Sequence, residues 1–378
     1  MVETIMDEEW NLLASFLPAD WRDLAKETGA MRRARGEITS PEILLQVLLM
    51  HVATGMSLKQ ATARAQTQGL ASMTDVALSK RLRTSERCLR ELARRMFEAS
   101  RFRHVGIRAP DGHRLRAVDA TTVQEPGATG TDWRIHYSIR LPDMRCDFYE
   151  VTDNKGAETY KRIPVQQGDV ILADRGYCHR EGVTDVLDQL GDVIVRLNST
   201  NFPLLEANQN VPFDIMAHLR RLSGHQAGEW DVRFEAKDET WAARLCAIRK
   251  SHHAAARTKE KILQEASKRQ TELRPETLEF AEYIFVLTSL PAAVLNVEEV
   301  LDLYRARWQI ELCFKRLKSL FQLGHVPKRS DDSARAWIEG KLVTVLLIER
   351  LIDEASFFSP WGFEIKAAQS LEGIPGSP

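Results

Sequence analysis

The spacing of apolar residues changes near residue 113, and this change constrains the fold more than any other feature of the chain. Before it, apolar residues recur with the period of amphipathic helices. After it, the pattern predicts strands at 115–123, 134–139, 148–152, 169–173 and 192–197. A helix is expected at 179–190, between the last two strands. Strand–helix–strand order after a set of helices predicts an α/β core that follows a helical domain.

The first 105 residues are predicted to be helical throughout. Pro41 suits the first turn of a helix, where proline is tolerated. Ser57 and Gln60 have the spacing of a capping box, which predicts the start of the next helix. Thr74 and Asp75 are expected to cap a further helix, and a last one is predicted from about Ser85 to Ala99.

Two of these short helices flank a Gly-containing turn at Gln68-Gly69, as in a helix-turn-helix. The second presents Lys80, Arg81 and Arg83, which we predict to contact DNA. The formal net charge of the chain is only −1, but residues 31–110 hold fifteen Lys and Arg against six Asp and Glu. Such a local cluster attracts phosphates. The alternative is a plain helical bundle with a solvated basic face.

The amino-acid composition excludes several classes of protein. With 378 residues, 44% hydrophobic and 28% charged, the chain is too apolar to be disordered and long enough for two or three domains. Its five cysteines form no Cys-x-x-Cys pair, so neither a disulfide framework nor a thiolate zinc site is indicated. No apolar run is long enough to span a membrane, and the acidic start does not resemble a secretory signal. We therefore expect a cytoplasmic protein without a membrane partner.

The second half of the chain divides into an insertion and a return to the core. Polar strand candidates and the basic stretch 252–269 predict an insertion. A strand at 283–289 and a helix from Asn296 to about Phe321 follow, the helix starting with Glu299 in a capping-box position. The predicted domains are a helical DNA-binding domain at 1–110, a core at 111–197 and 283–355, an insertion subdomain at 198–282 and a tail at 356–378.

Two aspartates lie at strand ends or inside strands. Asp174 directly follows the apolar run 169–173, and sites in α/β sheets form at the carboxyl ends of strands. Asp119 lies in the predicted strand 115–123, where aspartate is disfavoured. Taken singly, each has a structural explanation, because Asp174 suits a helix cap and Asp119 suits a bulge.

The long predicted helix carries the most informative pattern. At about 100° per residue, four polar groups share a stripe about 60° wide and about 21 Å long, namely Tyr304, Arg307, Glu311 and Lys318. Apolar residues flank this stripe on both sides, so Glu311 requires a cationic partner. An ion pair between Glu311 and Arg307 would explain those two residues but not the other two.

Asp119, Asp174 and Glu311 together form a set of hard oxygen donors suited to Mg²⁺ or Mn²⁺. Two such ions about 3.5–4 Å apart activate a nucleophile and stabilise a leaving oxygen in phosphodiester chemistry. Arg307 and Lys318, beside the glutamate, would bind phosphates. The residues therefore predict a two-metal site that acts on a nucleic acid.

The helix pattern Tyr304-x2-Arg307-x3-Glu311-x6-Lys318 resembles the YREK signature of the insertion-sequence-four family of bacterial transposases. The segments Val118-Asp119-Ala120-Thr121 and Ala173-Asp174-Arg175-Gly176-Tyr177 are also similar to that family. The resemblance covers roughly residues 35–350.

This resemblance implies a ribonuclease-H-like core with an Asp-Asp-Glu triad at Asp119, Asp174 and Glu311. It implies cut-and-paste transposition, in which transposon-end DNA is cut and joined to target DNA with Mg²⁺. Tyr304, Arg307 and Lys318 then correspond to contacts with the DNA end. The implied partners are the terminal inverted repeats, the target DNA and a second copy of the chain in the synaptic complex, because two ends are cut together. The implied location is the bacterial cytoplasm, at the nucleoid when bound.

Two other functions remain open from the sequence. Residues 362–378 are rich in Gly, Pro and Ser and depart from the helical continuation of the family. This favours a non-catalytic DNA-binding remnant of a transposon. A metal nuclease of the same fold, which cuts without strand transfer, would carry the same residues.

Overall fold

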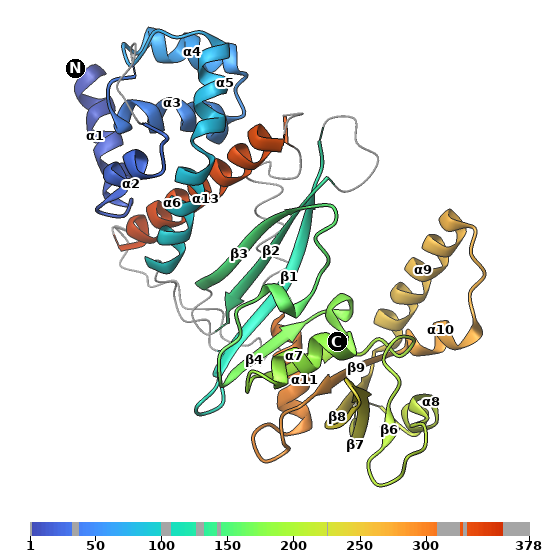
Figure 1. The fold of residues 1–378 in the computed structure, drawn as a ribbon. Helices are drawn as coiled ribbons and strands as arrows, with labels where there is room; N and C mark the ends of the chain where they lie inside the picture. Colours follow the sequence, from blue (N-terminus) through green and yellow to red (C-terminus); the bar gives the residue numbers. More distant parts are fainter. Residues whose placement is uncertain are drawn as a thin grey trace, which may run out of the picture.

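The protein is represented by a computed structural model that describes residues 2–31, 38–99, 107–125, 132–141, 145–224, 226–307, 326–327 and 331–357. A group of helices from the N-terminal part lies at one end, and a large mixed sheet forms the rest of the molecule (Figure 1). The α/β class predicted from the sequence is confirmed.

Six helices make up the N-terminal part, and we call them the N-terminal helices. They are α1 (Val2–Ser15), α2 (Trp21–Glu27), α3 (Pro41–Thr54), α4 (Leu58–Thr67), α5 (Asp75–Thr84) and α6 (Glu86–Ala99). The predicted starts are confirmed, because Ser57 forms a capping box with Gln60 and Thr74 accepts a hydrogen bond from the amide of Ala77. Gly55 ends α3 in the left-handed conformation that glycine adopts without strain.

One nine-stranded sheet runs through the rest of the chain, in the order β3-β2-β1-β4-β5-β9-β8-β7-β6. Its strands are β1 (Arg114–Val123), β2 (Trp133–Arg140), β3 (Arg145–Asp153), β4 (Asp169–Ala173), β5 (Asp192–Arg196), β6 (Leu205–Glu206), β7 (Ala227–Ala236), β8 (Glu239–Arg249) and β9 (Tyr283–Thr288). The strands β1, β4 and β5 are parallel, and the other pairs are antiparallel. The predicted strands are confirmed: β1, β2 and β3 are longer than predicted, β4 has the predicted bounds, and β5 and β9 each end one residue earlier.

Helices cover both faces of the central strands. On one face, α7 (Arg180–Leu187) buries Val183 and Val186 against Ile171 and Val193. On the other face, α11 (Val297–Ala306) joins a core that includes Leu172. The parallel strands are therefore buried from both sides, which explains why β4 is apolar along its whole length after its first residue.

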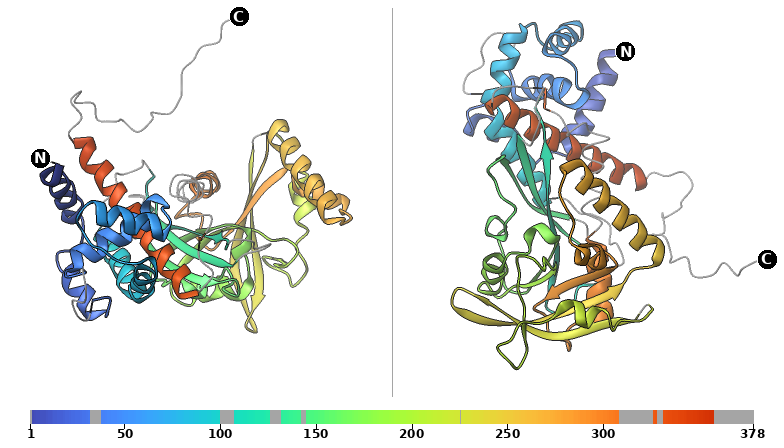
Figure 2. Two further views of the ribbon diagram at one scale, coloured as in Figure 1. Left: turned by 90° about the horizontal axis from the view of Figure 1, so that it is seen from above. Right: turned by 90° about the vertical axis from the view of Figure 1, so that its right-hand side faces the viewer.

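The region 198–282 extends this sheet. Its strands β7 and β8 form a long antiparallel pair, and β8 pairs with β9, which returns to β5. Three helices complete the region, namely α8 (Ile215–Leu219), α9 (His252–Arg269) and α10 (Pro275–Phe280). The basic stretch 252–269, for which the sequence predicted only an insertion, is the helix α9. It projects from the body of the molecule (Figure 2).

The last described helix, α13 (Asp331–Phe357), returns to the N-terminal helices. It packs mainly against α6, and also against α3 and α5. Its buried residues belong to the same core as those of α3 and α6. Among the residues that the structure describes, no helix is both long and apolar enough to cross a membrane.

Candidate active site

Asp119 and Asp174 are brought together by two neighbouring parallel strands. The register aligns Ala117 of β1 with Leu172 of β4, and each aspartate lies two residues further along its own strand direction. Ala117 and Leu172 belong to the core that α11 covers. Because side chains two residues apart on a strand lie on the same face, Asp119 and Asp174 lie on that face too. We call this pair the carboxylate site. Its position at the carboxyl end of β4 is the one predicted from the sequence.

The turn after β4 fixes the side chain of Asp174. Its Oδ1 accepts a hydrogen bond of 2.8 Å from the amide of Gly176, which caps the short 3-10 helix Arg175–Tyr177. A Cβ on Gly176 would lie 3.0 Å from that oxygen and 2.6 Å from Oε2 of Glu158. Gly176 therefore leaves room for two carboxylates beside the same turn. The capping explanation considered for Asp174 holds, and it also orients the carboxylate.

Asp119 lies in an electrostatically unfavourable position. Its pKa is raised to about 7, chiefly by burial and in part by the negative charges of Asp174 and Glu158. The amide of Ala120 donates a hydrogen bond of 2.8 Å to Oδ1, and Arg307 acts in the same direction, lowering the pKa. Burial, together with the repulsion from the other two carboxylates, outweighs these favourable contacts, so the charged group gains from a nearby cation.

Arg307, which caps the C-terminal end of α11, supplies the cationic side of the site. Nη1 of Arg307 lies 3.8 Å from Oδ2 of Asp119, and both side chains are largely buried. The Arg307 guanidinium also lies over the ring of Tyr304, 5.6 Å from its centre. Burial raises the pKa of Tyr304, so its hydroxyl keeps its proton at neutral pH. Two of the four residues in the predicted stripe therefore reach the carboxylate site.

The other two residues of the stripe, Glu311 and Lys318, lie outside the described residues, which stop at Arg307 and resume at Val326. Among the residues described, no group of three or more His, Cys, Asp or Glu side chains is placed to hold a metal ion. The two aspartates do fit such an ion by their chemistry. They are oxygen donors, and their mutual repulsion would be relieved by a divalent cation.

Sequence reasoning missed two residues of the site, Glu158 and Arg134. Burial raises the pKa of Glu158, and the charge of Asp174 adds to this effect. Arg134 on β2 lies 3.9 Å from Oε1 of Glu158 and donates a hydrogen bond of 2.6 Å to the carbonyl oxygen of Gly156. Glu158 lies in a loop between β3 and β4, where no strand pattern or motif marked it.

The predicted DNA contacts of the N-terminal part lie on a separate element. Lys80, Arg81 and Arg83 are on α5, where Lys80 and Arg83 are exposed and Arg81 is half-buried. The helix-turn-helix predicted from the sequence corresponds to α4 and α5, which pack against each other. This basic group is therefore carried by the N-terminal helices and not by the sheet.

Comparison with known proteins agrees with this geometry. Residues 142–347 match the family described as "Transposase DDE domain". The chain is 33% identical over 361 residues to the putative transposase InsL for insertion sequence element IS186A of Escherichia coli (strain K12), covering 93% of this chain and 96% of that one. It is 33% identical over 362 residues to the transposase for insertion sequence element IS421 of Escherichia coli, with the same coverage.

A more distant relative shares part of the chain. The transposase for insertion sequence element IS231F of Bacillus thuringiensis subsp. israelensis is 25% identical over 266 residues, covering 62% of this chain and 55% of that one. The family match spans β4 with Asp174 and α11 with Tyr304 and Arg307. The full-length similarity adds β1 with Asp119. The chain therefore belongs to the DDE transposases of bacterial insertion sequences.

Proposed function

We propose that Asp119, Asp174 and Glu311 are the catalytic triad of a ribonuclease-H-like core that cuts and joins transposon-end DNA. The observation that carries this proposal is that Asp119 and Asp174 lie side by side where the parallel pairing of β1 and β4 ends, with Arg307 at the end of α11 against Asp119. Glu311 is four residues beyond Arg307 in the sequence, one helical turn further along if the predicted helix continues.

The three carboxylates would hold divalent ions, Mg²⁺ or Mn²⁺, as the membership of the DDE family implies. When bound, two such ions supply an activated nucleophile and stabilise the leaving oxygen of the phosphodiester. The raised pKa of Asp119 supports this assignment, because burial and the nearby carboxylates together make its negative charge costly in the absence of a cation.

Arg307 and Tyr304 would hold the DNA strand at the carboxylates, together with Lys318. The guanidinium offers paired N–H donors to a phosphate, and the ring beneath it fixes its direction. The protonated Tyr304 hydroxyl is a neutral donor that adds no repulsion to a nearby phosphate.

The N-terminal helices would bind the terminal inverted repeats through Lys80, Arg81 and Arg83 of α5. Two ends must be cut together, so the active form would be a homodimer or a larger assembly that also engages target DNA. This places DNA binding and strand cleavage on separate parts of the chain, joined by the packing of α13 against α6.

The test is Mg²⁺-dependent cleavage of supercoiled DNA that carries the terminal repeats of the element. Wild type is compared with Glu311→Ala and Asp119→Asn at one salt concentration, because salt sets DNA affinity. Asp302→Asn is the matched control, since Asp302 is an exposed acid on α11 that pairs only with Arg305 at 3.3 Å among the described residues.

Cleavage at the element ends that is lost in both active-site variants and kept in the control supports the proposal. Binding of the ends without cleavage in any of the four proteins would identify a DNA-binding remnant. Cleavage without joining to target DNA would identify a nuclease of the same fold. Either of these two outcomes overturns the assignment of strand cleavage and transfer to this chain.

A further inference from the structure

The helix α9 rises from the edge of the sheet that carries the carboxylate site. Parallel pairing places the carboxyl ends of β4 and β5 at one edge. The strand β9 is antiparallel to β5, and β8 is antiparallel to β9, so β8 ends and β9 begins at this same edge. Because α9 starts at His252, three residues after β8 ends, it leaves the sheet from the catalytic side.

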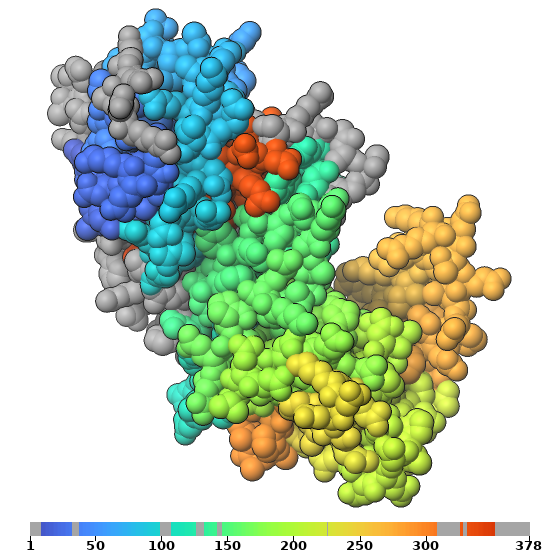
Figure 3. All heavy atoms as spheres, in the orientation of Figure 1, coloured from blue at the N-terminus to red at the C-terminus, as the bar shows by residue number. Residues whose placement is uncertain are grey.

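The base of α9 is firmly attached to the sheet. Nζ of Lys250 donates a hydrogen bond of 2.8 Å to the carbonyl oxygen of Ala281, and Lys259 pairs with Glu282 at 2.6 Å. Ser251 caps the first turn by accepting a hydrogen bond from the amide of Ala254. These contacts hold one face of the helix, on which Ala255 is the only buried residue. The remaining length of α9 stands clear of the body of the molecule (Figure 3).

The opposite face of α9 carries a row of positive charges. Arg257, Lys261 and Lys268 are exposed, and at about 100° per residue they lie within about 40° of one another. We call these three residues the α9 stripe, and it is about 17 Å long. Its spacing of four and then seven residues keeps all three on one side. The acids Glu260 and Glu265 lie to either side, and none of the stripe residues forms an ion pair within the described part of the chain.

Further cations lie between the stripe and the carboxylate site. Arg196 is at the end of β5 and Lys250 at the end of β8, both at the catalytic edge. Burial lowers the pKa of Lys250 to about 8, and the charge of Arg196 adds to this effect. The charges of Arg307 and Arg196 also act together on Tyr304. Positive charge therefore continues from the carboxylate site to the base of α9.

The two basic regions lie on opposite sides of the carboxylate site. The N-terminal helices reach the sheet through α6 on β3, at one end of the strand order. The helix α9 joins β8 to β9, which lie on the far side of β1 and β4. Figure 1 shows the same arrangement, with the N-terminal helices and α9 projecting in different directions. A duplex that crosses the catalytic edge would be contacted on both sides of the cut.

We propose that the α9 stripe binds the phosphate backbone of the donor duplex that flanks the element, beyond the point of cleavage. The inference rests on the proposed function, in which the N-terminal helices hold the terminal repeat and the carboxylates hold the bond to be cut. Three exposed cations in a row about 17 Å long fit the anionic backbone of a duplex and require no particular base sequence.

The test measures the salt dependence of binding by the full-length protein without Mg²⁺. The probe is one duplex of fixed length that carries a single terminal repeat and about 15 base pairs of the flanking donor DNA. The triple variant Arg257→Gln, Lys261→Gln and Lys268→Gln should lower the slope of log K against log salt by about 2.7, since each phosphate contact contributes about 0.9. If the two lines meet at 1 M salt, this slope difference corresponds to a loss of affinity for the flanked duplex of about 100-fold near 150 mM salt.

A second probe identifies which part of the DNA is bound. On a duplex that ends at the cleavage point, the triple variant should bind with the affinity of the wild type. Lys259→Gln is the matched control, because Lys259 lies on the inner face of α9 and is paired with Glu282. It should keep the wild-type slope on both probes, and circular dichroism checks that α9 is intact in every variant.

An unchanged slope in the triple variant overturns the proposal and makes the stripe an ordinary solvated helix face. Equal loss on both probes overturns the assignment to flanking DNA and points to the terminal repeat or the target. The proposed function is tested by a separate measurement. If it is wrong, Asp119→Asn and the wild type would give the same cleavage result, and this comparison does not depend on the salt slope measured for α9.

Discussion

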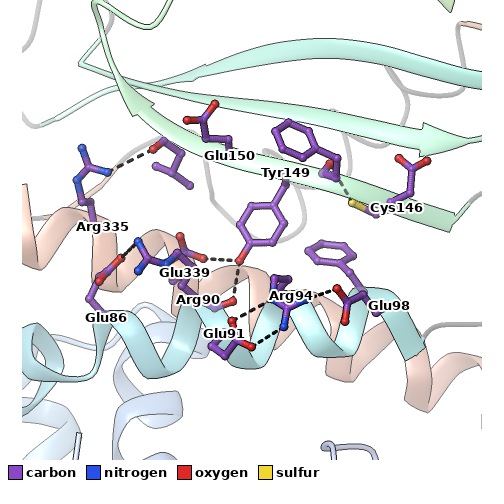
Figure 4. A pocket seen from close by; sticks show the side chains of 14 residues that line it. Glu86, Arg90, Glu91, Arg94, Glu98, Cys146, Tyr149, Glu150, Arg335 and Glu339 are labelled. Carbon is purple, nitrogen blue, oxygen red and sulfur yellow. Dashed lines mark hydrogen bonds and ion pairs between the residues drawn. The ribbon is translucent and has the colours of Figure 1, made fainter. Parts of the chain in front are cut away.

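Two regions of the molecule hold a buried acid with a raised pKa, and they differ in what surrounds it. Asp119 lies at the carboxylate site with a pKa of about 7. Glu339 of α13 lines a pocket of about 500 Å³ between α6, β3 and α13, and its pKa is about 8 (Figure 4). Burial is the largest cause in both cases, so the difference between the two regions lies in the partners.

Glu339 faces a neutral hydroxyl. The Tyr149 oxygen lies 2.9 Å from Oε2 of Glu339 and 2.9 Å from the carbonyl oxygen of Arg90. A tyrosine has one proton and cannot donate to both oxygens at once. If Glu339 is protonated, it donates to Tyr149, which then donates to Arg90. One proton on Glu339 therefore satisfies the whole group, and the region is structurally complete.

Asp119 faces other carboxylates. A proton on Asp119 would remove the repulsion from Asp174 and Glu158, but it would also weaken the contact with Arg307. The comparison shows that a raised pKa alone does not mark a catalytic group. A buried acid beside a hydroxyl is satisfied by a proton, whereas buried acids that face each other call for a cation.

The largest difference between the two regions should come from replacing the buried acid of each with its neutral amide. Asp119→Asn should lower DNA cleavage by about 10³-fold or more, because the variant lacks one of the three carboxylates proposed to hold the metal ions. Its thermal midpoint should stay the same or rise, because the repulsion is relieved. Glu339→Gln should keep its cleavage rate. Kinetics and thermal melts on both variants test this, and an active Asp119→Asn protein would contradict it.

A smaller effect is expected from adding a methyl group near each acid. Gly176→Ala should reduce cleavage by about 10- to 100-fold, because its Cβ would displace the carboxylate of Glu158 or that of Asp174. The effect should be weaker in a Glu158→Ala background. Gly340→Ala, whose Cβ would lie 3.1 Å from Cγ1 of Val52, should instead lower the thermal midpoint and spare the activity of folded protein. The reverse pattern would refute the comparison.

Divalent ions should stabilise one region and not the other. At ten times the dissociation constant, Mg²⁺ should raise the free energy of unfolding of the wild type by about 1.4 kcal/mol. The same gain is expected for Glu339→Gln, whose acid lies elsewhere, but not for Asp119→Asn. Denaturant titrations with and without Mg²⁺ measure this difference. Equal stabilisation of all three proteins would place the ion outside the carboxylate site.

The pH dependence of stability should report Glu339. Its pKa is about 8 in the folded protein and is near 4.5 when unfolded, so between these values the unfolded state releases a proton that the folded state keeps. Its contribution to stability is therefore complete below about pH 4.5 and falls with rising pH, by about 1 kcal/mol per unit, until about pH 8. Glu339→Gln should remove this fall. A variant with the wild-type pH profile would show that Glu339 is ionised in the folded state.

Local signals in the sequence were sufficient for the individual elements. Pro41, the capping box at Ser57 and the apolar run 169–173 act through contacts within a few residues, and the structure confirms each of them. Asp119 and Asp174 stood out as aspartates in or after a buried strand, and the structure brings them together at neighbouring strands, but their catalytic roles are still predictions. The proposed roles of Glu311 and Lys318 remain predictions outside the described residues.

Long-range pairing could not be predicted in the same way. The extension of the sheet through β7 and β8 depends on register between strands far apart in sequence. Glu158 reaches the carboxylate site only because its loop crosses the turn at Gly176. The contact of Arg134 with Glu158 depends on β2 lying beside β1. Each of these follows from tertiary packing and leaves no periodic signal.

The position of α13 has a consequence for how the chain folds during synthesis. Its Lys341 is buried and donates a hydrogen bond of 3.2 Å to the carbonyl oxygen of Ala53 on α3, across almost 290 residues of sequence. The core that α3 and α6 share with α13 is therefore incomplete until α13 has left the ribosome. Contacts at such separation slow folding. The nascent N-terminal helices should stay only partly ordered until α13 has been synthesised, so their order reports that the chain has been made at least as far as α13.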